Sequence, residues 1–136
     1  MKTELLNSLR QHDNTLIVWA LGNDGECIDA DPFWQGLLGD ELILSHSILV
    51  HGLQRSGQKD IDSNFTEVYS EHALGKPYRA QVWNTKESCY IQDCGTSFSA
   101  PLATIDAFIK AKEMFNQTAQ TPFYADVKRT FLMKLI

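Results

Sequence analysis

The sequence of 136 residues predicts an α/β fold in which a mostly parallel sheet is flanked by helices. Two observations lead to this prediction. A short amphipathic helical pattern near the N-terminus is followed at once by a continuous apolar run, which is typical of a strand buried on both faces of a parallel sheet. A long helical pattern then occupies much of the last third of the chain. The length fits a single domain over residues 1–136.

The first helix and strand are predicted within residues 3–21. Leucines recur at helical spacing over residues 3–12, and Asp13-Asn14 ends that helix. Residues 15–21 (Thr-Leu-Ile-Val-Trp-Ala-Leu) form the apolar strand, and Gly22-Asn23-Asp24-Gly25 ends it with residues that tolerate turn conformations. We therefore expect the Asn23 side chain at the carboxyl edge of the sheet, where ligands and catalytic groups gather.

The central region predicts strands separated by loops. Residues 26–40 are predicted as a mixed loop, and residues 54–62 as a polar surface loop. The apolar stretch at 47–51 predicts a second strand. Alternation over 78–83 predicts another strand, beside which residues 89–91 are expected to pair.

Two helices are predicted near the C-terminus. The first covers residues 97–114, with Pro101 within its first turns, and a final helix covers residues 124–135. The positions that recur at helical spacing are Leu102, Ile105, Phe108, Ile109 and Lys112 in the first helix and Val127, Phe131 and Leu135 in the second.

Composition excludes two classes of partner. The 12 basic and 17 acidic residues give a formal net charge of −5, and the chain has no basic stripe that could neutralise phosphates, so we expect no nucleic-acid partner. The longest apolar stretches are far shorter than the roughly 20 residues of a membrane-spanning helix, so we expect no membrane partner. The first residues lack the pattern of a secretory signal, and the odd count of three cysteines mildly favours a reducing compartment such as the cytoplasm.

Ser97 is the residue that best fits a chemical role. At the start of a buried helix, its hydroxyl would lie beside free backbone N–H groups and the positive end of the helix dipole, which stabilise developing negative charge. Gly95 permits close approach of a substrate backbone, and Thr96 tolerates extended geometry. An ordinary N-cap role for Ser97 remains an alternative.

The segment from Gly95 to Pro101, Gly-Thr-Ser-Phe-Ser-Ala-Pro, resembles the nucleophile signature of subtilisin-like serine endopeptidases. A second segment, Ala20-Leu21-Gly22-Asn23-Asp24-Gly25, resembles the part of that family whose Asn completes the oxyanion hole. The two segments occur in the family's order, with Ser97 lying 74 positions after Asn23. Ser63-Asn64 and Thr121-Pro122 are weaker matches.

The resemblance implies a role for two residues. Ser97 would be the nucleophile that attacks a peptide carbonyl, and Asn23 would donate a hydrogen bond to the oxyanion together with the Ser97 N–H. The implied substrate is a peptide or protein, and the implied chemistry needs no cofactor and no metal. Taken alone, Asn23 also fits a simple turn residue.

The resemblance covers only the C-terminal part of the family fold. Subtilisins order their triad Asp, His, Ser along the chain, and residues 1–22 contain no segment like those that carry the Asp and the His. We therefore expect a weak protease at most, or a subunit that receives Asp and His from a complementary chain and leaves an apolar face uncovered here. A non-catalytic module that holds an extended peptide, and a base rebuilt from His51 or His72, remain open.

The acidic side chains after the first strand raise the question of a cation site. Asp24, Glu26, Asp29 and Asp31 do not have the spacing of an EF-hand loop, so a solvated acidic loop is favoured. The cysteines and histidines likewise lack zinc-type spacing. A bridge between Cys89 and Cys94 stays open.

Overall fold

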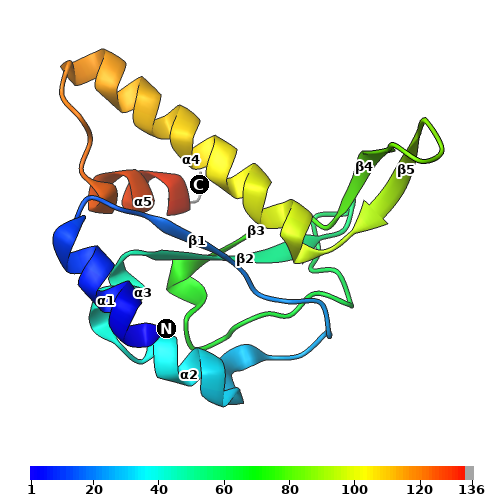
Figure 1. Ribbon diagram of the computed structural model, residues 1–136, viewed down its shortest axis with the longest axis horizontal. Helices are drawn as coiled ribbons and strands as arrows, with labels where there is room; N and C mark the ends of the chain where they lie inside the picture. Colours follow the sequence, from blue (N-terminus) through cyan, green and yellow to red (C-terminus); the bar gives the residue numbers. More distant parts are fainter. Residues whose placement is uncertain (134–136) are drawn as a thin grey trace.

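The computed structural model describes residues 1–133 and contains a three-stranded parallel sheet (Figure 1). Its strands are β1 (Ile17–Ala20), β2 (Ser47–Leu53) and β3 (Ala73–Pro77), in the order β1-β2-β3. Val18 pairs with Ile48, and Val50 pairs with Leu74. The prediction of an α/β fold with a mostly parallel sheet is therefore confirmed.

Helices cover both faces of this sheet (Figure 1). One face carries α1 (Lys2–Gln11), the 3₁₀ turn η1 (Ile28–Ala30), α2 (Pro32–Leu38) and α3 (Glu41–Ser45), and the other carries α4 (Thr96–Thr118) and α5 (Tyr124–Leu132).

The side chains of β2 alternate between these two layers, as a pleated strand requires. Leu49 packs into a cluster with Trp34 and Leu38, whereas Ile48 and Val50 pack against alanines of α4. The parity of a residue on β2 therefore decides which helical layer its side chain meets.

The prediction of a loop over residues 26–40 is wrong, because η1 and α2 lie there. Asp31 caps α2 by accepting a hydrogen bond from the Phe33 N–H at 2.8 Å, and Pro32 occupies the first helical position. Asp40 caps α3 in the same way through the N–H groups of Leu42 and Ile43. In the sequence, these short helices are marked by their caps rather than by a long apolar period.

Strand β3 was not predicted either. Its sequence, Ala-Leu-Gly-Lys-Pro, contains two residues that disfavour strands, and its extended form depends on pairing with β2 along its whole length. It is preceded by the 3₁₀ turn η2 (Ser70–His72).

The predicted pairing of residues 78–83 with 89–91 is confirmed as an antiparallel hairpin of β4 (Arg79–Asn84) and β5 (Cys89–Cys94). The hairpin projects away from the parallel sheet at the end where α4 begins (Figure 1). Trp83 and Tyr90 face each other across it, with ring centroids 5.2 Å apart, and both are exposed.

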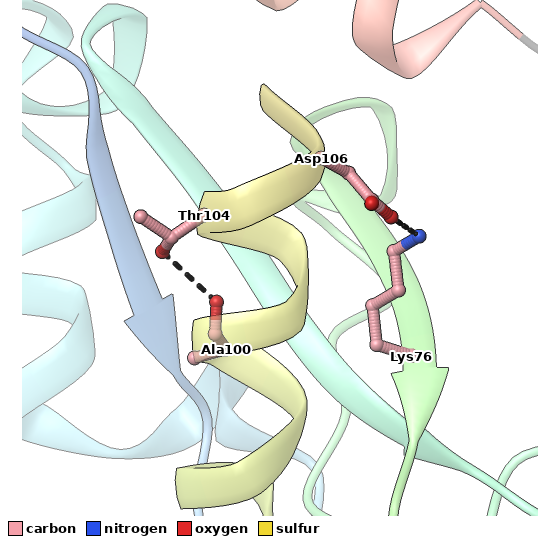
Figure 2. Close-up of polar contacts among 4 residues, drawn as sticks. All are labelled: Lys76, Ala100, Thr104 and Asp106. Atoms are coloured by element: carbon pink, nitrogen blue, oxygen red, sulfur yellow. Dashed lines mark hydrogen bonds and ion pairs between the residues drawn. The ribbon is translucent and has the colours of Figure 1, made fainter. Parts of the chain in front are cut away.

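Both C-terminal helices are confirmed. An ion pair between Lys76 of β3 and Asp106 ties α4 to the sheet, and the Thr104 hydroxyl donates to the Ala100 carbonyl at 2.9 Å within the helix (Figure 2). Helix α5 ends at Leu132, and Leu135 lies outside the described residues. None of the helices within residues 1–133 is long and apolar enough to cross a membrane.

Candidate active site at the N-terminus of α4

The turn after β1 brings Asn23 to the carboxyl edge of the sheet, as expected. Gly22 and Gly25 have φ angles of 114° and 68°, which side-chain-bearing residues rarely adopt, so glycine is needed at both ends of the turn. Asn23 and Asp24 between them are exposed.

Asn64 holds this turn in place. Its Oδ1 accepts hydrogen bonds from the backbone N–H groups of Asp24 at 2.9 Å and Glu26 at 3.0 Å, and its Nδ2 donates to the Leu21 carbonyl at 3.1 Å. Asn64 is 8% exposed, and these three hydrogen bonds to one carboxamide fix the backbone on both sides of Asn23. In the sequence, Asn64 is marked only by a weak family match, and no local pattern indicates this role.

Thr96 connects the turn to helix α4. Its hydroxyl accepts a hydrogen bond from the Gly22 N–H at 3.0 Å and donates to Asn23 Oδ1 at 3.1 Å, and its N–H donates to the same Oδ1 at 2.8 Å. Because a backbone N–H can only donate, the atom it meets must be the amide oxygen, and Nδ2 must point elsewhere. Thr96 is helical, as the first residue of α4, so its tolerance of extended geometry is not used here.

The N-cap position of α4 belongs to Gly95, with φ 145° and ψ 157°, a region open only to glycine. The N-cap alternative for Ser97 is therefore wrong, because Ser97 is the second residue of the helix. It is exposed, and its hydroxyl has no hydrogen-bond partner among residues 1–133. Its N–H lies in the first turn, where no intrahelical carbonyl is available.

The Ser97 hydroxyl and the Asn23 amide nitrogen converge beside Gly95, on the side where a side chain would project. A Cβ atom placed on Gly95 would lie 3.2 Å from Ser97 Oγ and 3.4 Å from Asn23 Nδ2. A side chain at position 95 would fill the space between the two groups.

The structure does not bring His51 to Ser97. His51 has the same parity on β2 as Leu49, so its side chain lies on the face opposite α4. His12 and His46 precede β1 and β2, at the other end of the strands.

His72 precedes β3 and is likewise at the amino edge of the sheet. Its Nδ1 lies 2.8 Å from Lys128 Nζ, which also donates to the carbonyls of Leu44 and Ser45 at 3.0 and 3.1 Å. Burial, followed by the nearby ammonium, lowers the pKa of His72, and burial lowers the pKa of Lys128 to about 8. This cluster joins α5 to α3 rather than serving Ser97.

Two of the four acidic residues after β1 bond through their carboxylates to groups of the protein itself. Asp29 accepts hydrogen bonds from the N–H groups of Glu67 and Val68, both at 3.0 Å, and Asp31 caps α2. No group of three or more potential metal ligands occurs in the described part of the chain. Cys27, Cys89 and Cys94 are exposed free thiols, so the alternative of a Cys89–Cys94 bridge is wrong.

Comparison with solved structures identifies the fold as that of subtilisin-like protease domains. The prenylagaramide maturation protease PagA matches with a TM-score of 0.65 at 22% identity, over 93% of this chain and 42% of that one. The self-cleaved protease domain of PatA matches with a TM-score of 0.68 at 22% identity, over 93% and 44%. A lanthipeptide protease matches with a TM-score of 0.66 at 15% identity, over 94% and 45%.

This chain therefore spans less than half the length of the proteases that share its fold, and it corresponds to the C-terminal part of that fold. No protein-family profile and no curated protein sequence matches it.

Proposed function

We propose that this chain carries the nucleophile and the oxyanion donors of a subtilisin-like serine endopeptidase. The supporting observation is the convergence of the exposed Ser97 hydroxyl and the Asn23 amide nitrogen beside Gly95. Ser97 Oγ attacks the carbonyl carbon of a peptide bond, and Asn23 Nδ2 with the Ser97 N–H stabilises the oxyanion that forms. The amine leaves and an acyl-enzyme remains, which water then hydrolyses.

This chemistry requires a base to accept the hydroxyl proton from Ser97. None of the four histidines, all of which lie in the described part, faces the hydroxyl. Without a base the nucleophile loses most of its activation, although oxyanion donors and binding still supply some catalysis. The isolated chain is accordingly feebly proteolytic at most.

The experiment is intact-protein mass spectrometry after incubation with a fluorophosphonate probe, with Ser97→Ala as the control. Slow labelling that disappears in the variant supports an activated Ser97. Asn23→Ala should lower the labelling rate further, because the probe's phosphoryl oxygen uses the same donors. Labelling that persists in Ser97→Ala, or its complete absence even at high probe concentration, contradicts activation of this serine in the isolated chain.

A composite enzyme is the second candidate, and an uncovered apolar surface on α4 favours it. The residues of α4 that face the sheet are small, namely Ser99, Ala100, Ala103 and Ala107. The large ones face outward: Leu102, Ile105, Phe108, Ile109 and Phe115 are 39%, 55%, 69%, 48% and 47% exposed. We call these five residues the outer face of α4. Such a continuous apolar stripe marks an interaction surface.

The outer face continues into a groove and an open sheet edge. Leu16 and Val18 of the β1 region line an apolar groove of about 320 Å³ with Phe108 and Tyr124. Strand β1 pairs with β2 on one side, and its other edge has no partner strand in the described part. A complementary polypeptide that adds a strand to β1 and covers α4 fits both features, and it would also supply the Asp and the His.

The two candidate enzymes and a non-catalytic module predict different fluorophosphonate labelling of Ser97. A composite enzyme predicts that fluorophosphonate labelling of Ser97 rises sharply when the complementary polypeptide is added. A non-catalytic module predicts peptide binding that survives Ser97→Ala, with no covalent step under any condition.

A further inference from the structure

An open cleft of about 880 Å³ lies at the carboxyl ends of β2 and β3. Leu53 and Pro77, which are paired across the two strands, form one wall, and Arg79 with Ala80 at the start of β4 forms another. Arg55, on the loop after β2, completes the rim. The cleft is therefore bordered by the parallel sheet and by the projecting hairpin.

The cleft carries unpaired positive charge. Arg55 and Arg79 are both exposed, and neither has a carboxylate partner within residues 1–133, whereas Arg129 is paired with Asp126 at 2.9 Å. The acidic residue of the cleft, Asp60, is 2% exposed, and its Oδ1 accepts the Asp62 N–H. In a chain of net charge −5, two of the four arginines thus line the same cleft.

The cleft adjoins the candidate active site. The Gly95 N–H donates to the Tyr78 carbonyl at 2.8 Å, and Arg79 follows Tyr78 and pairs with Cys94 in the hairpin. Ser97 is two residues after Gly95. An extended peptide advances about 3.3 Å per residue, so we expect a residue two to four positions from the bond held at Ser97 to lie over this cleft.

We infer that this cleft binds a carboxylate of the peptide held at Ser97, and that the site prefers acidic peptides. The inference rests on the proposed peptide-handling function of Ser97. A guanidinium presents parallel N–H donors that match the two oxygens of a carboxylate, and two such groups on one rim suit a single anionic group. Carboxamides from Gln54, Gln81 and Gln92 supply further donors. The carboxylate comes from an Asp or Glu side chain or from a peptide C-terminus.

The test uses the Ser97→Ala variant, so that binding is measured without turnover. In ¹⁵N-labelled protein, the four arginine Nε–Hε signals are followed during titration with acetyl-Ala-Ala-Glu-Ala-Ala-amide, with its Gln counterpart, and with a Glu-free peptide that has a free C-terminus. We expect the Arg55 and Arg79 signals to shift with a carboxylate-bearing peptide, and the Arg10 and Arg129 signals to stay in place. The Glu peptide or the free-C-terminus peptide should bind about threefold to tenfold more tightly than the Gln amide.

Variants distinguish binding at this subsite from a general effect of the protein's positive charges on acidic peptides. Arg55→Gln and Arg79→Gln should each reduce the preference for the carboxylate, whereas Arg10→Gln on α1 should not. Equal affinity for Glu and Gln peptides, no binding of any of the three peptides, or an equal loss in Arg10→Gln would overturn the inference. Fluorophosphonate labelling of Ser97 in the wild-type chain is measured independently, so the subsite and the nucleophile fail separately.

Discussion

Asn23 Oδ1 accepts two hydrogen bonds from Thr96, one from its N–H at 2.8 Å and one from its hydroxyl at 3.1 Å. This contact joins the turn after β1 to the first residue of α4, which lies 73 positions later. It also caps an N-terminus that has no side-chain cap of its own. The amide oxygen of Asn23 is thereby committed to Thr96, which leaves the amide nitrogen as the group that can donate to a ligand.

Replacing Thr96 by Val should destabilise the fold by about 1–3 kcal/mol, because the shape is kept while the Gly22 N–H loses its acceptor in a site where Thr96 is 1% exposed. Thr96→Ser keeps the hydroxyl and should retain most of the stability. Urea denaturation measures both variants. A Thr96→Val protein as stable as wild type would show that this hydroxyl does not hold the turn.

Replacing Asn64 by Ala should cost about 2–4 kcal/mol, since two backbone donors and one carbonyl of the turn lose their partner. Amide hydrogen exchange at Asp24 and Glu26 should accelerate in the variant. The matched control is Asn84→Ala: its Oδ1 also accepts two backbone N–H groups, but in the exposed turn of the hairpin, so we expect a loss below about 1 kcal/mol. Equal losses in the two variants would contradict the role assigned to Asn64.

The sequence predicted the elements whose pattern is local. The apolar run of β1, the alternation of β4 and the helical period of α4 each carry enough signal over their own length. Strand β3 carries none, because its Gly and Pro are tolerated only through pairing with β2. Helix α2 was missed because its signal is a cap followed by Pro, which was interpreted as loop punctuation.

The residues of the candidate site likewise divide into those that have a local sequence motif and those that have none. Ser97 and Asn23 were predicted as site residues because short motifs surround them, and their approach to each other follows from the fold. The supporting residues Thr96 and Asn64 act through hydrogen bonds between distant segments, for which no spacing rule exists. The outer face of α4 was visible as a helical period, but a period does not tell which of two faces meets the sheet.

Placing charge on the outer face of α4 should improve behaviour in solution without unfolding the chain. Ile105→Lys with Phe108→Lys removes two large exposed apolar side chains, so we expect a higher monomer fraction in analytical ultracentrifugation and weaker binding of a hydrophobic dye. The control is Val68→Lys, because Val68 is 73% exposed and its N–H bonds to Asp29 of η1, in the layer opposite α4. Aggregation that is unaffected by the double variant, or relieved equally by Val68→Lys, would argue against an interaction surface on α4.

The contact between His72 and Lys128 predicts a pH dependence of stability. The pKa of His72 is lowered below 6.5 by burial and by the Lys128 ammonium, with Glu71 opposing, so the folded state binds fewer protons than the unfolded state. Stability should therefore fall as the pH is lowered from about 6.5 toward the folded-state pKa. In His72→Gln this part of the slope should disappear, while stability at about pH 7.5 changes by less than about 1 kcal/mol because the Gln oxygen still accepts from Lys128. Urea midpoints between about pH 5 and about pH 7.5 test this, and an unchanged slope in the variant would contradict it.

Gly52 and Tyr78 provide the sharpest packing test, because the ring of Tyr78 covers the glycine. A Cβ atom on Gly52 would lie 2.7 Å from both Cβ and Cγ of Tyr78, which is 3% exposed and cannot move outward freely. Gly52→Ala should therefore cost about 1–3 kcal/mol or more. Gly36→Ala, in α2 with no atom within 4 Å of the new methyl, should instead stabilise by roughly 0.5–1 kcal/mol.

The same clash should reach the candidate site, because the Tyr78 carbonyl accepts the Gly95 N–H at 2.8 Å. Displacement of Tyr78 moves the residue beside which Ser97 and Asn23 converge, so the backbone amide signals of Gly95 and Ser97 should shift in Gly52→Ala and stay in place in Gly36→Ala. If the ring is the cause, Gly52→Ala combined with Tyr78→Ala should lose less stability than the two single losses added together, since the second change removes the atoms that the first one meets. Strict additivity in this double-mutant cycle would mean that the glycine is required for its backbone rather than for the space under Tyr78.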